Sequence, residues 1–400
     1  MGLNETVSAE RLHIGFFGMR NAGKSSLVNA VTGQQLAVVS DVKGTTTDPV
    51  KKAMELLPLG PVVIIDTPGL DDEGELGELR VAKAKQILAQ TDIAVLVIDG
   101  TAGMSAQDEA LIEQFQARKL PYLIAYNKAD LTADRPASGE STLYVSAATG
   151  EGVHALKEAL GRFAAARKAP KVLVADLLSP GDVVVLVTPI DESAPKGRLI
   201  LPQQLTLRDI LDAHAAAVVC QPEELKQTLA GLAKKPRMVI TDSQAFGRVS
   251  ADVPADIPLT SFSILMARYK GDLKALVRGA AILRGLRDGD RVLISEGCTH
   301  HRQCNDIGTV KIPGWIEGFS GAKPAYAFTS GGEFPDDLSS FQLIVHCGGC
   351  MLNEAEMKHR IERATEAGVP IVNYGIVIAQ MHGILARSVE LFPDVAALLG

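Results

Sequence analysis

The sequence predicts an α/β protein of three domains, spanning residues 1–167, 170–266 and 270–400. Short apolar runs alternate with helical patterns along most of the chain, which is typical of parallel sheets covered by helices. Glycine-rich and carboxylate motifs follow the apolar runs of the first domain, whereas cysteine and histidine motifs follow those of the last. At 400 residues and 46% apolar content, the chain is long enough to build two or three cores.

Charge and cysteine content exclude several classes of protein. The net charge of −7 gives no electrostatic footprint for nucleic acid. No apolar run approaches the roughly 20 residues that span a bilayer, and the first ten residues lack the pattern of a secretory signal. We therefore expect a cytoplasmic protein without a nucleic-acid or membrane partner.

The five cysteines of a cytoplasmic protein favour metal or redox chemistry over disulfides. Cys220, in an expected apolar helix, is interpreted as a packing residue.

The first motif follows an apolar run at 13–18. Residues 18–25 read GMRNAGKS, the G-x-x-x-x-G-K-S phosphate loop, and a helical pattern begins at Ser26. Glycines let backbone N–H groups face phosphate oxygens, Lys24 can reach the β and γ phosphates, and the Ser25 hydroxyl can bind Mg²⁺. The predicted phosphate contacts are Gly18, Asn21, Ala22, Gly23, Lys24, Ser25 and Ser26.

Three more nucleotide motifs follow in order. The run 62–65 leads to D-T-P-G, where Asp66 is expected in the Mg²⁺ shell and Gly69 beside the γ-phosphate. The run 122–126 leads to N-K-A-D, in which Asp130 can accept two hydrogens from guanine but not from adenine. The motif S-A-A then offers a backbone N–H to the guanine oxygen. Together these motifs predict a GTPase that binds GTP, GDP and Mg²⁺. The predicted base contacts are Asn127, Lys128, Asp130, Ser146 and Ala147.

This domain resembles the TrmE–Era branch of GTPases. Residues 44–48 read GTTTD and are similar to the first switch of that branch, which implies Thr46 as a Mg²⁺ ligand. Leu70 stands where Ras-like proteins carry a water-orienting glutamine, so slow intrinsic turnover is expected. Asn21 matches the asparagine that helps hold potassium in cation-activated relatives; the alternative is that Asn21 caps or tightens the loop. The predicted catalytic residues are Lys24, Thr46 and Asn21.

Residues 170–266 carry no chemical motif. Their alanine and valine content suits a contact surface, so self-association is a hypothesis for this segment. His214 is interpreted as a packed or partly exposed side chain on a helix rather than as a ligand. The expected elements are apolar runs at 183–187 and 259–264, a strand at 238–241 and helices near 205–218 and 222–235.

Three cysteines and two histidines follow two predicted strands near the end of the chain. The run 291–295 leads to C-T-H at 298–300, and the run 341–345 leads to H-C-G-G-C at 346–350. Parallel sheets bind ligands outside the carboxyl ends of their strands. Both motifs should therefore converge if the two strands are neighbours.

These residues suit more than one metal. Two cysteines and two histidines would satisfy tetrahedral zinc, whereas three thiolates suit a 4Fe-4S cluster with one iron open to an exchangeable ligand. Cys304 is either a further thiolate or a bystander, and spacing alone does not decide. Asn353 is expected to begin a helix whose positive end favours a thiolate or an anionic cluster at Cys350.

The whole chain resembles the HydF family of FeFe-hydrogenase maturation GTPases. The resemblance rests on a TrmE-like GTPase domain, a motif-free middle domain and C-x-H followed distantly by H-C-G-G-C. It implies a 4Fe-4S cluster on Cys298, Cys347 and Cys350, with His300 and His346 as further ligands or as neighbours of the ligands.

The same resemblance implies a homodimer, formed by the middle domain. It also implies that the chain holds a di-iron precursor, made with two radical-SAM maturases, and delivers it to apo-FeFe-hydrogenase. Two other classes stay open: a tRNA-modification or ribosome-assembly GTPase with a structural zinc module, which the acidic charge disfavours, and a redox-sensing GTPase.

Overall fold

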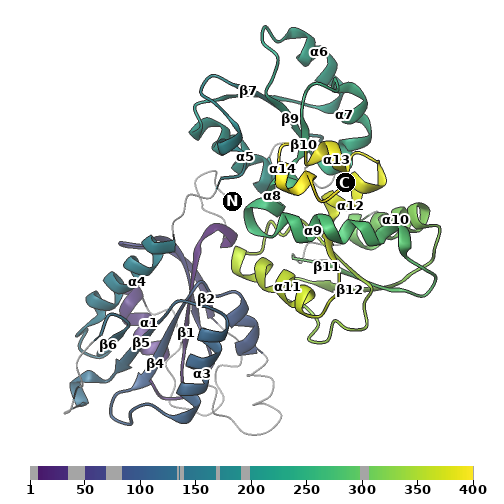
Figure 1. The fold of residues 1–400 in the computed structure, drawn as a ribbon. Helices are drawn as coiled ribbons and strands as arrows, with labels where there is room; N and C mark the ends of the chain where they lie inside the picture. Colours follow the sequence, from purple (N-terminus) through teal and green to yellow (C-terminus); the bar gives the residue numbers. More distant parts are fainter. Residues whose placement is uncertain are drawn as a thin grey trace. The chain divides into compact units, whose positions relative to one another are not determined.

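The computed structural model divides into two compact units, Met1–Pro170 and Lys171–Gly400. Both units are α/β, as the sequence predicts, and helices pack against parallel strands in each (Figure 1). Within the described part of the chain, no helix is both long and apolar enough to cross a membrane. The described residues are 8–34, 50–68, 83–132, 135, 139–167, 172–190, 199–297 and 306–399.

The first unit is built on a six-stranded sheet with the order β2-β3-β1-β4-β5-β6. Only β2 runs antiparallel to its neighbour. β4 reads IAVLVID, an almost continuous apolar run, because helices bury both faces of a parallel strand. One face packs on α1 (Lys24–Thr32) and α4 (Val153–Arg167), and the other on α3 (Ala106–Ala117) and the helical residues 83–89. The strands are β1 (Leu12–Phe17), β2 (Val50–Leu56), β3 (Gly60–Asp66), β4 (Ile93–Asp99), β5 (Tyr122–Asn127) and β6 (Thr142–Tyr144).

The second unit contains two four-stranded parallel sheets with the orders β10-β9-β7-β8 and β12-β11-β13-β14. The two sheets share one topology, because in each the first strand has the second on one side and the third on the other. The points where the strand order reverses lie between β7 and β9 and between β11 and β13, where parallel sheets bind ligands. The strands are β7 (Val183–Val187), β8 (Ala216–Cys220), β9 (Met238–Thr241), β10 (Leu259–Ser261), β11 (Arg291–Glu296), β12 (Ala325–Ser330), β13 (Leu343–His346) and β14 (Ile371–Asn373).

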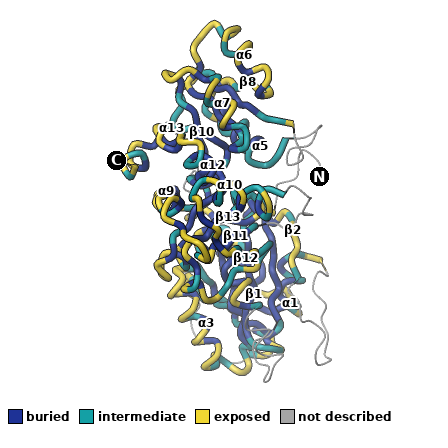
Figure 2. The backbone as a smooth tube through the Cα atoms, turned by 90° about the vertical axis from the view of Figure 1, so that its right-hand side faces the viewer, coloured by how far each residue is buried: buried dark blue, intermediate teal, exposed yellow. Residues whose placement is uncertain are grey.

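A single hydrophobic core runs through the second unit and includes strands of both sheets. Figure 2 shows β11 and β13 buried beneath the helices. The helices are α5 (Leu201–Asp212), α6 (Leu225–Gly231), α7 (Phe246–Asp252), α8 (Phe262–Lys270), α9 (Leu273–Gly279), α10 (Ile312–Ser320), α11 (Glu354–Glu366), α12 (Tyr374–Met381), α13 (Leu385–Ser388) and α14 (Pro393–Ala396).

The helix expected near 205–218 is wrong in its second half. α5 ends at Asp212, and His214 has a φ of 56°, a left-handed conformation that ends a helix rather than continuing it. Residues 216–220 form the edge strand β8 instead, paired with β7. Cys220 therefore ends a strand and is half-buried, and His214 lies in a turn. The sequence of β8, AAVVC, contains two β-branched residues that favour a strand.

Candidate functional sites

The phosphate loop joins β1 to α1. A side chain at Gly18 would place its Cβ 2.2 Å from the Val97 carbonyl oxygen, so only glycine fits there. Gly23 has a φ of 85°, which glycine adopts without strain. Lys24 is buried, and its Nζ donates to the carbonyl oxygens of Gly18 (2.9 Å) and Met19 (2.7 Å). The ammonium group is therefore already held over the loop that would surround a phosphate.

Two residues beside the loop have the donor set of a Mg²⁺ site. The Ser25 hydroxyl donates to Asp66 Oδ2 at 2.6 Å. Asp66 Oδ1 is buried without a hydrogen-bond partner among the described residues. Burial raises the pKa of Asp66, and the Ser25 hydrogen bond and Lys24 oppose that rise. An orphaned carboxylate oxygen beside a hydroxyl fits a hard cation. Thr46 and Gly69, also predicted here, lie outside the described residues.

Asn127 connects the phosphate loop to the base-recognition segments. Its Nδ2 donates to the Ala22 carbonyl oxygen at 2.9 Å, and its Oδ1 accepts from the Ala147 N–H at 3.0 Å. A Cβ at Gly23 would lie 2.2 Å from that Nδ2, so the contact also requires glycine at position 23. One buried amide thus fixes the distance between the phosphate and guanine ends of the site.

The guanine end is shaped by Lys128, which was predicted, and by Arg135, which the sequence analysis did not identify. Lys128, in a left-handed conformation with a φ of 61°, donates to Asp99 Oδ2 at 2.5 Å. Arg135 donates to the Ala129 carbonyl oxygen and pairs with Glu151 Oε1, at 2.5 Å in each case. Arg135 therefore ties the segment before Asp130 to the loop after Ala147. It belongs to no motif, so no sequence signal indicates it.

We expect Asp130→Asn to weaken GTP binding and to relax discrimination toward xanthosine nucleotides. The Asp130 side chain is exposed and available to a base. A carboxylate accepts both guanine hydrogens, whereas an amide would place a donor against one of them, which costs about 1–3 kcal/mol, or roughly tenfold to hundredfold in affinity. Titration with GTP and XTP measures both affinities. An unchanged GTP affinity would refute the assignment of Asp130.

Cys347 lies where the second sheet of the second unit reverses its strand order. β11 and β13 are parallel neighbours, as predicted, with Ser295 beside His346. The Cys347 sulfur accepts N–H groups from Gly297 (3.0 Å) and Gly349 (3.4 Å). Hydrogen bonds of this kind favour the charged form of an acceptor, here the thiolate that binds metals.

Cys350 follows in the same loop and is held differently. Lys270 is buried and its Nζ donates to the carbonyl oxygens of Cys350 (3.3 Å) and Leu352 (2.9 Å). Asn353 begins α11, as predicted, and its side chain accepts from the Glu356 N–H. Burial nevertheless raises the pKa of the Cys350 thiol, which Lys270 only partly opposes. Burial of the thiol therefore opposes the effect that the helix end is expected to have at Cys350.

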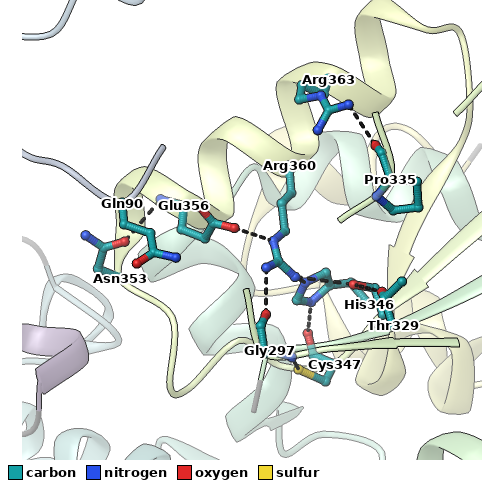
Figure 3. Close-up of polar contacts among 12 residues, drawn as sticks. Gln90, Gly297, Thr329, Pro335, His346, Cys347, Asn353, Glu356, Arg360 and Arg363 are labelled. Carbon is teal, nitrogen blue, oxygen red and sulfur yellow. Dashed lines mark hydrogen bonds and ion pairs between the residues drawn. The ribbon is translucent and has the colours of Figure 1, made fainter. Parts of the chain in front are cut away.

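His346 has both ring nitrogens engaged in a fully buried network (Figure 3). Its Nδ1 donates to the Cys347 carbonyl oxygen at 2.8 Å, so Nε2 is the acceptor for Arg360 Nη1 at 3.1 Å. Burial and the Arg360 charge lower the pKa of His346 to about 3, so the imidazole is neutral near pH 7. Neither nitrogen is open in this arrangement. The interpretation of His346 as a neighbour of the ligands therefore has the geometric support.

Arg360, at 0% exposure, organises this network. Its Nε donates to Glu356 Oε1 at 2.8 Å, and Nη1 also reaches Ser295 Oγ at 3.3 Å. Nη2 donates to the Gly331 carbonyl oxygen at 2.8 Å, and the Phe334 ring lies 5.2 Å from the guanidinium carbon. Sequence analysis missed Arg360 because a Glu and an Arg four residues apart normally form a solvent-exposed helix pair.

The structure leaves part of the metal hypothesis untested. Cys298, His300 and Cys304 lie outside the described residues. Among the residues that are described, no three histidine, cysteine, aspartate or glutamate side chains are grouped so as to hold a metal ion. Neither Cys347 nor Cys350 forms a disulfide with another described residue.

Three features define a P-loop GTPase domain: the phosphate loop, the Asp66 carboxylate, and the hydrogen bonds by which Asn127 connects the loop to the base-recognition segments. Residues 13–128 match the family model of the 50S ribosome-binding GTPases. Residues 173–271 match the dimerization domain of hydrogen maturase F, and residues 274–391 match its tetramerization domain. The last two models together cover more than half of the chain, which therefore belongs to the hydrogen maturase F family. The resemblance seen in the motifs is confirmed.

Individual relatives match part of the chain. The tRNA modification GTPase MnmE of Nitrosomonas europaea is 35% identical over 156 residues, 38% of this chain and 34% of that protein. MnmE of Laribacter hongkongensis is 36% identical over 159 residues, 38% of this chain and 35% of that protein. The chain thus spans about a third of the length of these relatives. The solved structure of Aquifex aeolicus Era covers 52% of this chain and 93% of its own, with 18% identity and a TM-score of 0.33.

Proposed function

We propose that the chain is a cytoplasmic, GTP-hydrolysing scaffold for assembly of the FeFe-hydrogenase H-cluster. In this proposal it binds a 4Fe-4S cluster, holds the di-iron precursor made with two radical-SAM maturases, and delivers that precursor to apo-FeFe-hydrogenase. The observation that carries the proposal is one chain with a GTPase domain, two hydrogen maturase F matches and a cysteine motif at a strand-order reversal.

The proposed cluster ligands are Cys298, Cys347 and Cys350. The hydrogen bonds from Gly297 and Gly349 to the Cys347 sulfur support this assignment, because they suit a thiolate. A cluster held by three thiolates has one iron free to accept a bridging ligand from a second metal unit. We assign His346 the role of orienting the Cys347 backbone, since both of its ring nitrogens are occupied.

GTP is proposed to act as a switch rather than as a reagent at iron. Ser25, Asp66 and Thr46 would hold Mg²⁺, and Lys24 would neutralise the β and γ phosphates. Leu70 in the glutamine position predicts slow turnover, and potassium held by Asn21 remains part of the proposal. Hydrolysis would change partner affinity through a coupling of about 1–3 kcal/mol between the two sites.

Self-association is proposed for the second unit, with dimerisation assigned to residues 170–266 and cluster binding to residues 270–400. The dimerization and tetramerization descriptions of the matched models support oligomer formation. The alternative function, a tRNA-modification GTPase with a structural zinc module, has support in the MnmE relatives. Those relatives cover only 38% of this chain, so they favour the alternative less.

Anaerobic reconstitution tests the proposal. The protein should bind about four irons and four sulfides per chain, as a 4Fe-4S cluster requires. Loaded with precursor by its maturases or with a synthetic mimic, it should then activate apo-hydrogenase. Stoichiometric zinc with no sulfide after the same treatment would refute the scaffold and favour the zinc-bearing GTPase.

A further inference from the structure

β12 is an edge strand without the usual protection of an edge. It pairs with β11 on one side, and among the described residues no strand pairs with its other side. Its sequence, AYAFTS, contains no charged residue and no proline. Natural edge strands carry charges, prolines or covering elements because their free N–H and C=O groups otherwise pair with another chain. β12 is therefore built for an interface rather than for solvent.

The geometry of β12 shows what this edge presents. The Ala325 N–H donates to the Asp290 carbonyl oxygen at 2.8 Å, toward β11. Since alternate residues of a parallel strand hydrogen-bond on opposite sides, the backbone groups of Tyr326 and Phe328 face the free edge. Phe328 is 40% exposed, and its ring lies 6.4 Å from that of Tyr326. Within the described part of the chain, the edge thus offers backbone groups without a partner strand, beside an exposed Phe328 ring and a half-buried Tyr326.

The charge pattern favours a second copy of this chain as the occupant. In a two-fold symmetric antiparallel pairing the residues near the axis lie close to their own copies, so a charge near the middle of the strand meets a like charge. The edge strand β2 carries Lys51, Lys52 and Glu55, whereas β12 carries no charge. Among the described edge strands, the three-residue β6, β10 and β14 are shorter, and β8 lies in the region matched by the dimerization model.

We propose that β12 pairs antiparallel with β12 of a second copy, joining two four-stranded sheets into one of eight strands. The strand lies within residues 274–391, the region that matches the tetramerization model. This proposal rests on the self-association proposed above, in which residues 170–266 form the dimer interface. It assigns the tetramer interface to a particular strand. Two dimers joined through β12 would form the tetramer.

Phe328→Lys should convert tetramers to dimers. Phe328 is near the middle of β12, so with the two-fold axis at the middle of the strand a lysine there lies close to its own copy. Such a like-charge contact should raise the tetramer dissociation constant about a hundredfold. Sedimentation velocity across a range of protein concentrations measures this constant, and circular dichroism checks that the variant is folded. Because the measurement needs neither GTP nor a cluster, its result is independent of whether the chain is a scaffold.

Charge exchange provides the matched control. Phe328→Glu alone should also give dimers, whereas an equal mixture of the lysine and glutamate variants should restore tetramers, since opposite charges then meet. Tetramers that survive both single substitutions with the wild-type constant would overturn the assignment of β12. A mixture that stays dimeric would also overturn it, because a homotypic pairing requires rescue. An unsubstituted chain that never exceeds a monomer would refute the proposed self-association itself, whereas one that stops at dimers would refute only the β12 interface.

Discussion

Cys347→Ser should abolish or severely perturb the 4Fe-4S cluster while GTP hydrolysis stays within about twofold of the unsubstituted rate. Serine keeps the size of the side chain but replaces the thiolate that the Gly297 and Gly349 N–H groups surround with a hydroxyl that rarely binds iron. The GTPase motifs lie in Met1–Pro170, a separate compact unit, so their chemistry should be unaffected. Iron and sulfide content, electron paramagnetic resonance and phosphate release measure the two effects.

Cys220→Ser is the matched control for this experiment. Cys220 is a half-buried thiol at the end of β8, outside the H-C-G-G-C motif, and burial raises its pKa, which disfavours a thiolate. This variant should keep the full cluster and the full ability to activate apo-hydrogenase. A Cys347→Ser protein that still activates hydrogenase normally would contradict the scaffold function, even if its iron content fell.

The sequence predicted the parts of the sites that depend on local pattern. The phosphate loop, the strand before Asp66 and the helix that begins after Asn353 each follow from a few adjacent residues whose conformation is nearly forced. The sequence did not predict that β11 and β13 are neighbours. It predicted only that the two cysteine and histidine motifs converge if they are. Strand order is set by packing between distant segments, which spacing along the chain does not record.

In two places tertiary contacts act against a preference that the local sequence indicates. The segment that became β8 is rich in alanine and continues a helical pattern, yet pairing with β7 stabilises it as a strand. At Cys350 the nearby helix end favours a thiolate, and burial of the side chain opposes that effect. In both cases tertiary contacts, invisible in the local sequence, oppose a local preference.

Arg360→Met should lower the free energy of unfolding of the second unit by about 3–5 kcal/mol, the usual cost of breaking a fully buried ion pair. Glu356 Oε2 is buried and has no hydrogen-bond partner among the described residues, so the loss of Arg360 would leave an uncompensated carboxylate. His346 Nε2 would also lose its donor, and the imidazole could then turn and release the Cys347 carbonyl oxygen. The thiolate loop should loosen as the unit destabilises.

Denaturant unfolding followed by the fluorescence of Trp315 measures this change, because the single tryptophan of the chain lies in the second unit. Arg363→Met is the matched control. Arg363 lies on the same helix and donates to the carbonyl oxygens of Pro335 and Asp336, both at 2.7 Å, but its side chain is 22% exposed. Its loss should cost only about 1 kcal/mol, since water can replace it.

A second comparison separates the buried charge from lost packing. If the unpaired Glu356 carboxylate causes most of the loss, the double variant Arg360→Met with Glu356→Gln should be more stable than Arg360→Met alone, because no charge then remains buried. The loss of stability that remains in the double variant would then come from the His346 network. A disturbed His346 network should also change the spectrum of a reconstituted cluster. Equal stabilities for Arg360→Met and Arg363→Met would instead mean that the buried guanidinium does not hold the thiolate loop in place.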